Sequence, residues 1–215
     1  EYISWKGVFV FLALIGVIVL IFSFRLKESL SVENRLQGSI FSTFLTFGVI
    51  IKNRLFMSYV GIQSFLLGSM FAYIAASPFI FQSFYGLSAF IFSLCFGANG
   101  AALVIGANVG GKLPNRQALA IGVLAFVVAA LYTIAVLIIQ PYWLFVEIGF
   151  FAMLLLMGIT FPAISTLAME SERQYAGSAS ALIGCFSMLL GACMMPVVGI
   201  AGDYTAIPMG VIMLT

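Results

Sequence analysis

Long apolar stretches separated by short polar connections dominate the sequence. Each complete stretch is long enough to cross a hydrocarbon core, which takes about 20 residues of helix. Their apolar character is continuous and does not alternate as in the strands of a membrane β-barrel. The pattern therefore predicts an all-α, polytopic membrane protein. The complete stretches run about Trp5–Phe24, Leu55–Phe81, Leu87–Val109, Ala118–Ile139, Trp143–Met169 and Gly177–Ala201, and another follows Asp203 and reaches Thr215.

The basic residues indicate how the chain is oriented in the membrane. Cytoplasmic loops of membrane proteins are enriched in Lys and Arg. We therefore expect the first, third and fifth connections to be cytoplasmic, with Lys6, at the outer end of the first stretch, as the exception. Eight of the nine Lys and Arg residues lie in or beside these alternate connections, namely Arg25, Lys27, Arg35, Lys52, Arg54, Lys112, Arg116 and Arg173.

The first connection is the longest, and from Asn34 to Lys52 it mixes apolar and polar residues. This mixture predicts a helix that lies at the cytoplasmic membrane interface. A long cytoplasmic connection after one helix and before a run of six is the arrangement at the midpoint of a two-half transporter. We therefore expect residues 1–24 to be the last helix of an N-terminal bundle and residues 25–54 to be the inter-bundle connection. Residues 55–215 would form the C-terminal bundle, truncated in its last helix.

Composition excludes several classes of protein. The 215 residues are 63% hydrophobic and only 7% charged, whereas soluble domains carry about 25% charged residues. The net charge of +2, spread along the chain, does not indicate a nucleic-acid partner. The absence of histidine excludes Ser–His and Cys–His catalysis and His-ligated metals, and the three cysteines lie in apolar stretches. We expect neither enzyme activity nor a metal or cofactor.

Three segments carry a resemblance to a known family. Tyr73–Phe81 (YIAASPFIF), followed by Tyr85–Ser88 (YGLS), resembles the seventh transmembrane helix and next loop of the Bcr/CflA drug-resistance family, a branch of the major facilitator superfamily. Phe96–Gly100 (FGANG) and Gly111–Arg116 (GKLPNR) are similar to that family's eighth helix and cytoplasmic turn. Ala176–Leu182 (AGSASAL) resembles the start of its eleventh helix. The resemblance extends from about Trp5 to the end of the sequence.

This resemblance implies a twelve-helix, two-bundle transporter in the bacterial cytoplasmic membrane that exports small amphipathic drugs by alternating access. A proton gradient would drive it, and no cofactor is expected. Its partners would be membrane lipid, the small amphipathic substrate and the N-terminal half of the same protein. One alternative keeps the fold but imports a sugar or an organic anion, and an anion importer would more often place Lys or Arg within its helices. The other alternative is a non-transporting membrane scaffold, which would lack a wet cavity.

Five polar residues within the stretches are candidates for substrate binding. Glu147 is the one acidic residue inside an apolar stretch, and an intramembrane carboxylate suggests a functional site. It could take a proton or attract a cationic substrate, or it could simply reach the aqueous interface. The neutral residues could bind substrate or hydrogen-bond neighbouring helices. The five candidates are Gln63, Tyr73, Ser77, Asn99 and Glu147.

Four further residues are candidates for gating. Lys112 and Arg116, in the turn between the third and fourth stretches, could form ion pairs with Glu170 or Glu172, or could serve only to set the topology. Pro78 and Pro196 each remove a backbone donor and favour a kink. In addition, small residues on the sixth stretch predict close helix packing along it, namely Gly177, Ala181, Gly184, Ala192 and Gly199.

Overall fold

The computed structural model describes residues 5–25, 40–139 and 142–199, and every regular element in these ranges is helical. The chain divides into two compact units, Glu1–Ser39 and Ile40–Thr215. The first unit contains helix α1 (Trp5–Ser23), whose side chains from Val8 to Phe22 are largely exposed and apolar. A helix that is apolar on all sides needs lipid or other apolar helices around it.

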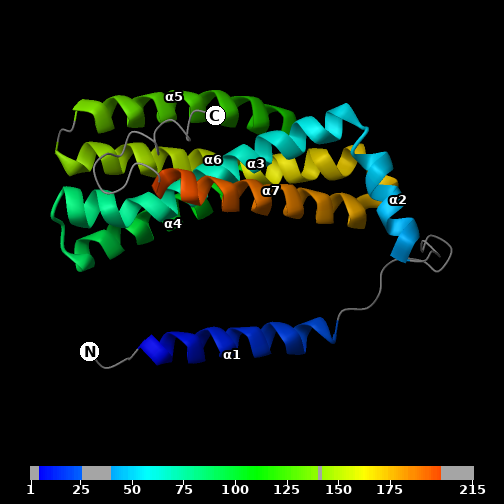
Figure 1. Cartoon of the computed structure of the whole chain (residues 1–215), viewed down its shortest axis with the longest axis horizontal. Coiled ribbons are helices and arrows are strands. Elements are labelled where there is room, and N and C mark those ends of the chain that lie inside the picture. The colour runs from blue at the N-terminus through cyan, green and yellow to red at the C-terminus, as the bar shows by residue number, and fades with distance from the viewer. Residues whose placement is uncertain (1–4, 26–39, 140–141, 200–215) are drawn as a thin grey trace. The chain divides into compact units, whose positions relative to one another are not determined.

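The second unit contains the remaining helices, and Figure 1 shows α3 to α7 packed along one common direction. Within the described residues, six helices including α1 are long and apolar enough to span a membrane, which confirms the predicted all-helical membrane fold. The predicted run after Asp203 lies outside the described residues. The helices are α2 (Ile40–Ile50), α3 (Arg54–Pro78), a π-helix (Phe79–Phe84), α4 (Ala89–Gly110), α5 (Asn115–Ile139), α6 (Trp143–Ser171), a 3₁₀ turn (Arg173–Tyr175) and α7 (Ala176–Gly199).

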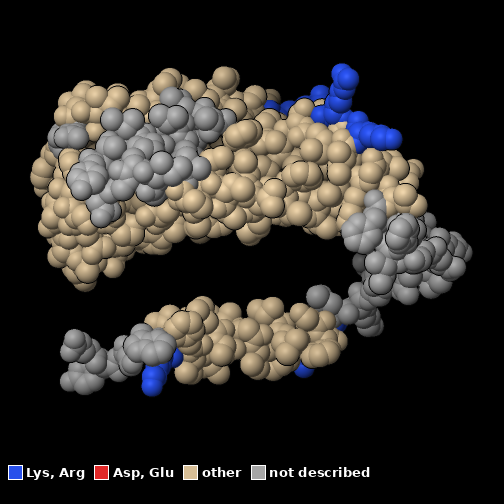
Figure 2. All heavy atoms as spheres, in the orientation of Figure 1, with Lys and Arg blue, Asp and Glu red and all other residues tan. Residues whose placement is uncertain are grey.

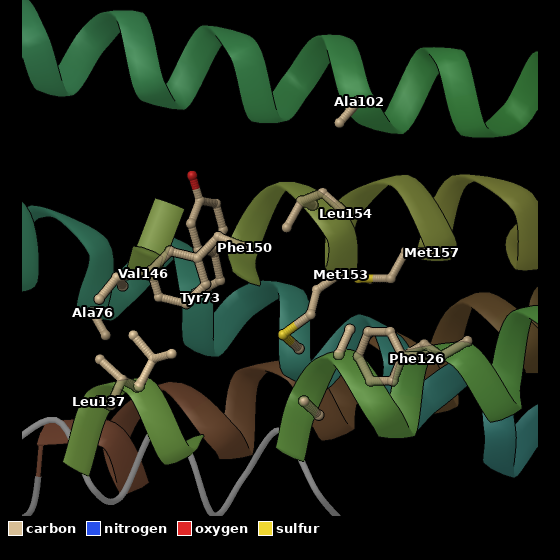
Figure 3. Close-up of a cluster of buried hydrophobic side chains, with 14 of the residues drawn as sticks. Tyr73, Ala76, Ala102, Phe126, Leu137, Val146, Phe150, Met153, Leu154 and Met157 are labelled. Atoms are coloured by element: carbon tan, nitrogen blue, oxygen red, sulfur yellow. The ribbon is translucent and has the colours of Figure 1, made fainter. Parts of the chain in front are cut away.

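Helix α6 is the centre of this unit, since it contacts α3, α4, α5 and α7. It contributes a buried row from Val146 to Ile164, which packs against apolar residues of α3, α4 and α5. Figure 3 shows part of this core, with Phe150, Met153 and Met157 of α6 between the neighbouring helices. Its neighbours leave one stripe uncovered, since Leu144, Ile148 and Phe151 recur at helical spacing and are all exposed.

Helices α4 and α6 approach each other backbone to backbone. A Cβ atom on Gly106 would meet the carbonyl group of Leu155, and one on Gly158 would meet that of Leu103. A Cβ atom on Gly110 would likewise meet the backbone of Ile159. Gly106 and Gly110 have the small-xxx-small spacing that lets membrane helices pack closely. These glycines therefore fix how α4 and α6 lie against each other.

The close packing predicted along the sixth stretch is not observed in the described chain. Ala181 and Ala192 of α7 are exposed. A Cβ atom on Gly177 or Gly184 would have no atom within 4 Å. Helix α7 packs on α3 through the face that carries Ser187, whose hydroxyl oxygen lies 3.3 Å from that of Ser64 on α3. The spacing identified a small-residue surface but not the direction in which it faces.

The basic residues of the second unit lie at one end of it, which we call the basic end. There α2 meets α3, α4 meets α5, and α6 meets α7, and Figure 2 shows Lys and Arg side chains over the corner between α2 and α3. Asn53 accepts hydrogen bonds from the backbone N–H groups of Leu55 and Phe56 and so caps α3. The exposed basic residues of this end are Lys52, Arg54, Lys112, Arg116 and Arg173.

Helix α2 is the described part of the predicted interfacial helix, whose earlier residues, through Ser39, lie outside the described chain. Ile50 is fully buried against Phe56 of α3 and Ala179 of α7. Leu45 and Val49 are exposed instead. One face of α2 thus packs on the bundle while another stays apolar and uncovered within the second unit, as an interfacial helix requires.

Candidate functional site

Four of the predicted substrate-binding residues are buried inside the bundle, and we call them the polar cluster: Tyr73, Ser77, Asn99 and Glu147. Tyr73 and Ser77 are one turn apart on α3, Asn99 is on α4 and Glu147 is on α6. Their exposed fractions are 3%, 0%, 1% and 8%, respectively. Side chains from three separate stretches of the sequence therefore gather in one buried region.

Asn99 connects the three helices. Its Nδ2 donates a hydrogen bond of 2.9 Å to the hydroxyl oxygen of Tyr73 and one of 3.2 Å to Oε2 of Glu147. Figure 3 shows the Tyr73 hydroxyl group pointing out of the apolar core toward α4, the helix that carries Asn99. Because an amide NH₂ group has two protons, these two bonds use its whole donor capacity.

The cluster retains unused hydrogen-bonding capacity. Ser77 Oγ, Asn99 Oδ1 and Glu147 Oε1 are buried, and none of the three has a hydrogen-bond partner among the described residues. An unsatisfied buried polar atom costs about 1–3 kcal/mol, and more if it is charged. No ion pair to Glu147 is found in the described part of the chain, where the basic residues of the second unit lie at the basic end. The arrangement therefore offers acceptor atoms to a proton or to a positively charged group.

Aromatic rings surround the cluster. The Tyr73 ring stacks on Phe96 of α4, with 5.8 Å between the ring centroids and an interplanar angle of 11°. Its other contact is an edge-to-face pair with Phe150 of α6, at 5.1 Å. Phe150 in turn packs edge to face on Phe81 of the π-helix, at 5.9 Å. These rings shield the polar groups on the core side, while Phe96 itself is 41% exposed.

Glu147 lies inside the bundle and does not reach the aqueous interface, which its position near the end of a stretch had left open. It lies about 6 Å along α6 from Trp143, the first residue of the helix. Tyr142, just before the helix, is 63% exposed, whereas Glu147 points inward to Asn99. Asn99 is near the middle of α4. The carboxyl group is thus close to the start of α6, but it contacts α4 near the middle of that helix.

Gln63 lies apart from the polar cluster. Its Oε1 accepts a hydrogen bond of 3.3 Å from the hydroxyl group of Ser165 on α6. It precedes Tyr73 by ten residues, about 15 Å along α3. In the structure Gln63 therefore bonds two helices to each other near the basic end.

The predicted gating residues occupy two places. Lys112 and Arg116 are exposed at the turn between α4 and α5, and in the described chain neither forms an ion pair with Glu170 or Glu172. Glu172 Oε1 accepts a hydrogen bond of 2.6 Å from Asn53 Nδ2 instead. This bond ties the start of α3 to the connection between α6 and α7, and nothing in the sequence pattern pointed to it.

Pro78 and Pro196 are both exposed and both lie near the end of a helix. Pro78 ends α3 and is followed directly by the π-helix, so α-helical bonding gives way to π-helical bonding just after Ser77 of the polar cluster. Tyr85, which follows the π-helix, has a buried hydroxyl group with no partner among the described residues. Burial raises the pKa of Tyr85, so this hydroxyl group is neutral at physiological pH. The π-helix has no signal in the sequence apart from the proline.

Fold and site together define a multi-pass membrane protein with a polar site buried between its helices. The family model of the Major Facilitator Superfamily matches residues 1–196, and the chain belongs to this superfamily. It is 37% identical over 215 residues, 98% of the chain, to the Uncharacterized MFS-type transporter YdgK of Bacillus subtilis, of which it covers 53%.

A more distant relative is the Bicyclomycin resistance protein homolog of Haemophilus influenzae. The chain is 26% identical to it over 224 residues, which are 97% of this chain and 54% of that protein. The chain thus spans about half the length of the curated relatives it matches.

Proposed function

We propose that the complete protein is a secondary transporter of the bacterial cytoplasmic membrane that exports small amphipathic drugs in exchange for protons by alternating access. The observation that carries this proposal is the buried carboxyl group of Glu147. A carboxylate inside a membrane helix bundle is costly and usually has a function. Among the described residues it has one hydrogen-bond donor, Asn99, and its second oxygen has no partner. A group of this kind is suited to bind and release a proton.

Two further observations support the proposed direction of transport and the proposed class of substrate. The basic residues of the second unit lie outside the buried interior, so the described part of the chain brings to the site none of the positive charge that an organic anion would need. The printed name of the Haemophilus influenzae relative associates that protein with resistance to bicyclomycin. Both favour export of neutral or cationic drugs over import of an anion.

The test uses the complete gene expressed in an efflux-deficient bacterium. Energised cells loaded with fluorescent drugs, some neutral and some cationic, should lose them faster than control cells, and a protonophore should abolish the difference. Glu147→Gln should reduce energised export at least tenfold, because a proton must leave its binding group for the exchange to proceed. Glu170→Gln, at an exposed acid near the other end of α6, should export normally.

Export that survives the protonophore would refute proton coupling. No export at all, with the protein verified in the membrane, would refute the drug-efflux proposal and favour an importer of the same fold.

A further inference from the structure

We infer that the corner between α2 and α3, residues 45–55, binds an anionic phospholipid of the cytoplasmic leaflet. The phosphate group of the lipid would lie on Lys52 and Arg54, and its acyl chains would lie on the exposed apolar side chains of the corner. This site is separate from the polar cluster, so the inference goes beyond the proposed function and does not depend on what the protein transports.

The corner exposes apolar and basic side chains together. Leu45 and Val49, one turn apart on α2, and Leu55, in the first turn of α3, are each more than half exposed. Lys52 and Arg54, which lie between them in the sequence, are exposed as well. Figure 2 shows basic side chains over this corner. Apolar and cationic groups side by side match the two parts of an anionic phospholipid.

Helix α2 cannot turn its exposed apolar face inward. Ile50 is fully buried against Phe56 of α3 and Ala179 of α7. A rotation of α2 that buried Leu45 and Val49 would therefore remove Ile50 from the core. The exposed face thus needs an apolar cover from outside the second unit, and a membrane provides one.

The corner lies at the level expected of lipid headgroups. The membrane span that contains α3 begins at Arg54, and the span formed by α6 ends at Ser171. The hydrogen bond between Asn53 and Glu172 joins the residues just outside these two spans. Both spans therefore end at the same level, and Lys52 and Arg54 lie at this boundary. Long basic side chains at a membrane helix end reach the headgroup layer.

Charge selects an anionic headgroup over a zwitterionic one. In the described chain, the basic end has five exposed basic residues against two acidic ones, Glu170 and Glu172. Neither Lys52 nor Arg54 forms an ion pair with another described residue, and Glu172 accepts a hydrogen bond from Asn53 instead. We expect this end to face the cytoplasm, where basic clusters next to membrane helices attract anionic lipids.

The turn between the helices holds the backbone of both cations in place. Asn53, which lies between them, caps α3 through its Oδ1 and donates to Glu172 through its Nδ2. The backbone N–H of Lys52 donates a hydrogen bond of 3.2 Å to the carbonyl oxygen of Val49. Only the side chains of Lys52 and Arg54 therefore have to become ordered when a phosphate group binds, which limits the entropic cost.

The test is lipid binding to the complete purified protein in detergent, followed by native mass spectrometry. The protein is titrated with phosphatidylglycerol or with phosphatidylcholine of the same acyl chains, and we expect tighter binding of phosphatidylglycerol. Lys52→Gln/Arg54→Gln should weaken phosphatidylglycerol binding on the order of tenfold and leave phosphatidylcholine binding unchanged. Lys112→Gln/Arg116→Gln removes the same charge from another turn of the basic end and should match wild type.

Two further measurements separate the acyl chains from the headgroup. Leu45→Ser/Val49→Ser should weaken binding of both lipids, because both use the same apolar contacts. Glycerol phosphate, which carries the charge without acyl chains, should not displace phosphatidylglycerol. Salt should reduce the preference for phosphatidylglycerol, since exposed charges are screened beyond about 10 Å at 0.1 M. Melting temperatures identify any variant that misfolds.

Three outcomes would overturn the inference. Equal binding of the two lipids by wild type would mean that the corner does not select an anionic headgroup. An equal loss in both charge variants would mean that the lipid responds to the charge of the whole basic end. Displacement by glycerol phosphate would indicate a site for free phosphate. The drug-export proposal could stand in each case, and a failure of export would leave the lipid site unaffected.

Discussion

Asn99 makes the polar cluster one connected unit, because its NH₂ group is the donor both to Tyr73 and to Glu147. A neutral hydrogen bond between membrane helices contributes only about 0.6 kcal/mol on average. A bond to a buried carboxylate matters more, because removing it leaves a charge unsatisfied. The energetic role of Asn99 should therefore depend on whether Glu147 is ionised.

The first prediction is that Asn99→Leu destabilises the complete protein by about 1–3 kcal/mol when Glu147 is ionised and by less when it is protonated. The gap in melting temperature between wild type and variant should therefore widen as the pH rises through the range in which Glu147 loses its proton. Tyr73 loses the same donor at every pH and contributes a constant part. In the Glu147→Gln background the gap should not vary with pH. A gap that is independent of pH in both backgrounds would contradict the ionic role of this bond.

The sequence identified the residues of the polar cluster but could not show that they contact one another. Polarity inside an apolar stretch singles out Tyr73, Asn99 and Glu147 one by one. The 100° rotation per residue fixes directions within one helix. The rotation of one helix relative to the next depends on packing, so the meeting of Asn99 with Glu147 could not be predicted.

At the scale of elements, the order and length of the helices follow from the sequence because the membrane demands long apolar runs. The predicted stretches and the observed helices differ by only a few residues at their ends. What the apolar pattern could not supply was the contact between helices. Lipid and protein interior are both apolar, so hydrophobicity does not distinguish a packed face from an exposed one. The sequence therefore could not show which face of α7 packs on α3.

The second prediction concerns the contact between α4 and α6. Gly106→Ala places a Cβ atom against the carbonyl group of Leu155, and a backbone group cannot rotate away. We expect a loss of about 1–3 kcal/mol, measured as a lower melting temperature of the complete protein in detergent. Gly97→Ala, on the same helix with open space around it, is the matched control and should be neutral. Equal stability of the two variants would argue against the backbone contact.

At the scale of the whole molecule, alternation of basic and uncharged connections orients the chain. The third prediction is that the basic end faces the cytoplasm. In a complete protein without other cysteines, Gln117→Cys should react with a membrane-impermeant maleimide only after the cells are opened. Tyr142→Cys, exposed at the other end of the bundle, should react in intact cells. The reverse labelling pattern would invert the topology.

The fourth prediction is that the 215-residue chain alone does not transport. A site between two bundles needs both of them, and the curated relatives are about twice as long as this chain. Purified chain in proteoliposomes should therefore give no flux of tetraphenylphosphonium above protein-free vesicles under a proton gradient. The complete protein serves as the positive control. Significant flux from the chain alone would show that one bundle is sufficient.

The glycine contact between α4 and α6 also has a mechanical consequence. Two helices whose backbones touch at Gly106, Gly110 and Gly158 form a stiff pair. Asn99 belongs to α4 and Glu147 to α6, so the stiff pair should hold these two side chains at a fixed distance from each other. Tyr73 belongs instead to α3, where regular α-helical bonding gives way after Pro78. A force that deforms the bundle should therefore move the end of α3 near Pro78 first. The hydrogen bond between Asn99 and Tyr73 should then break before the one between Asn99 and Glu147.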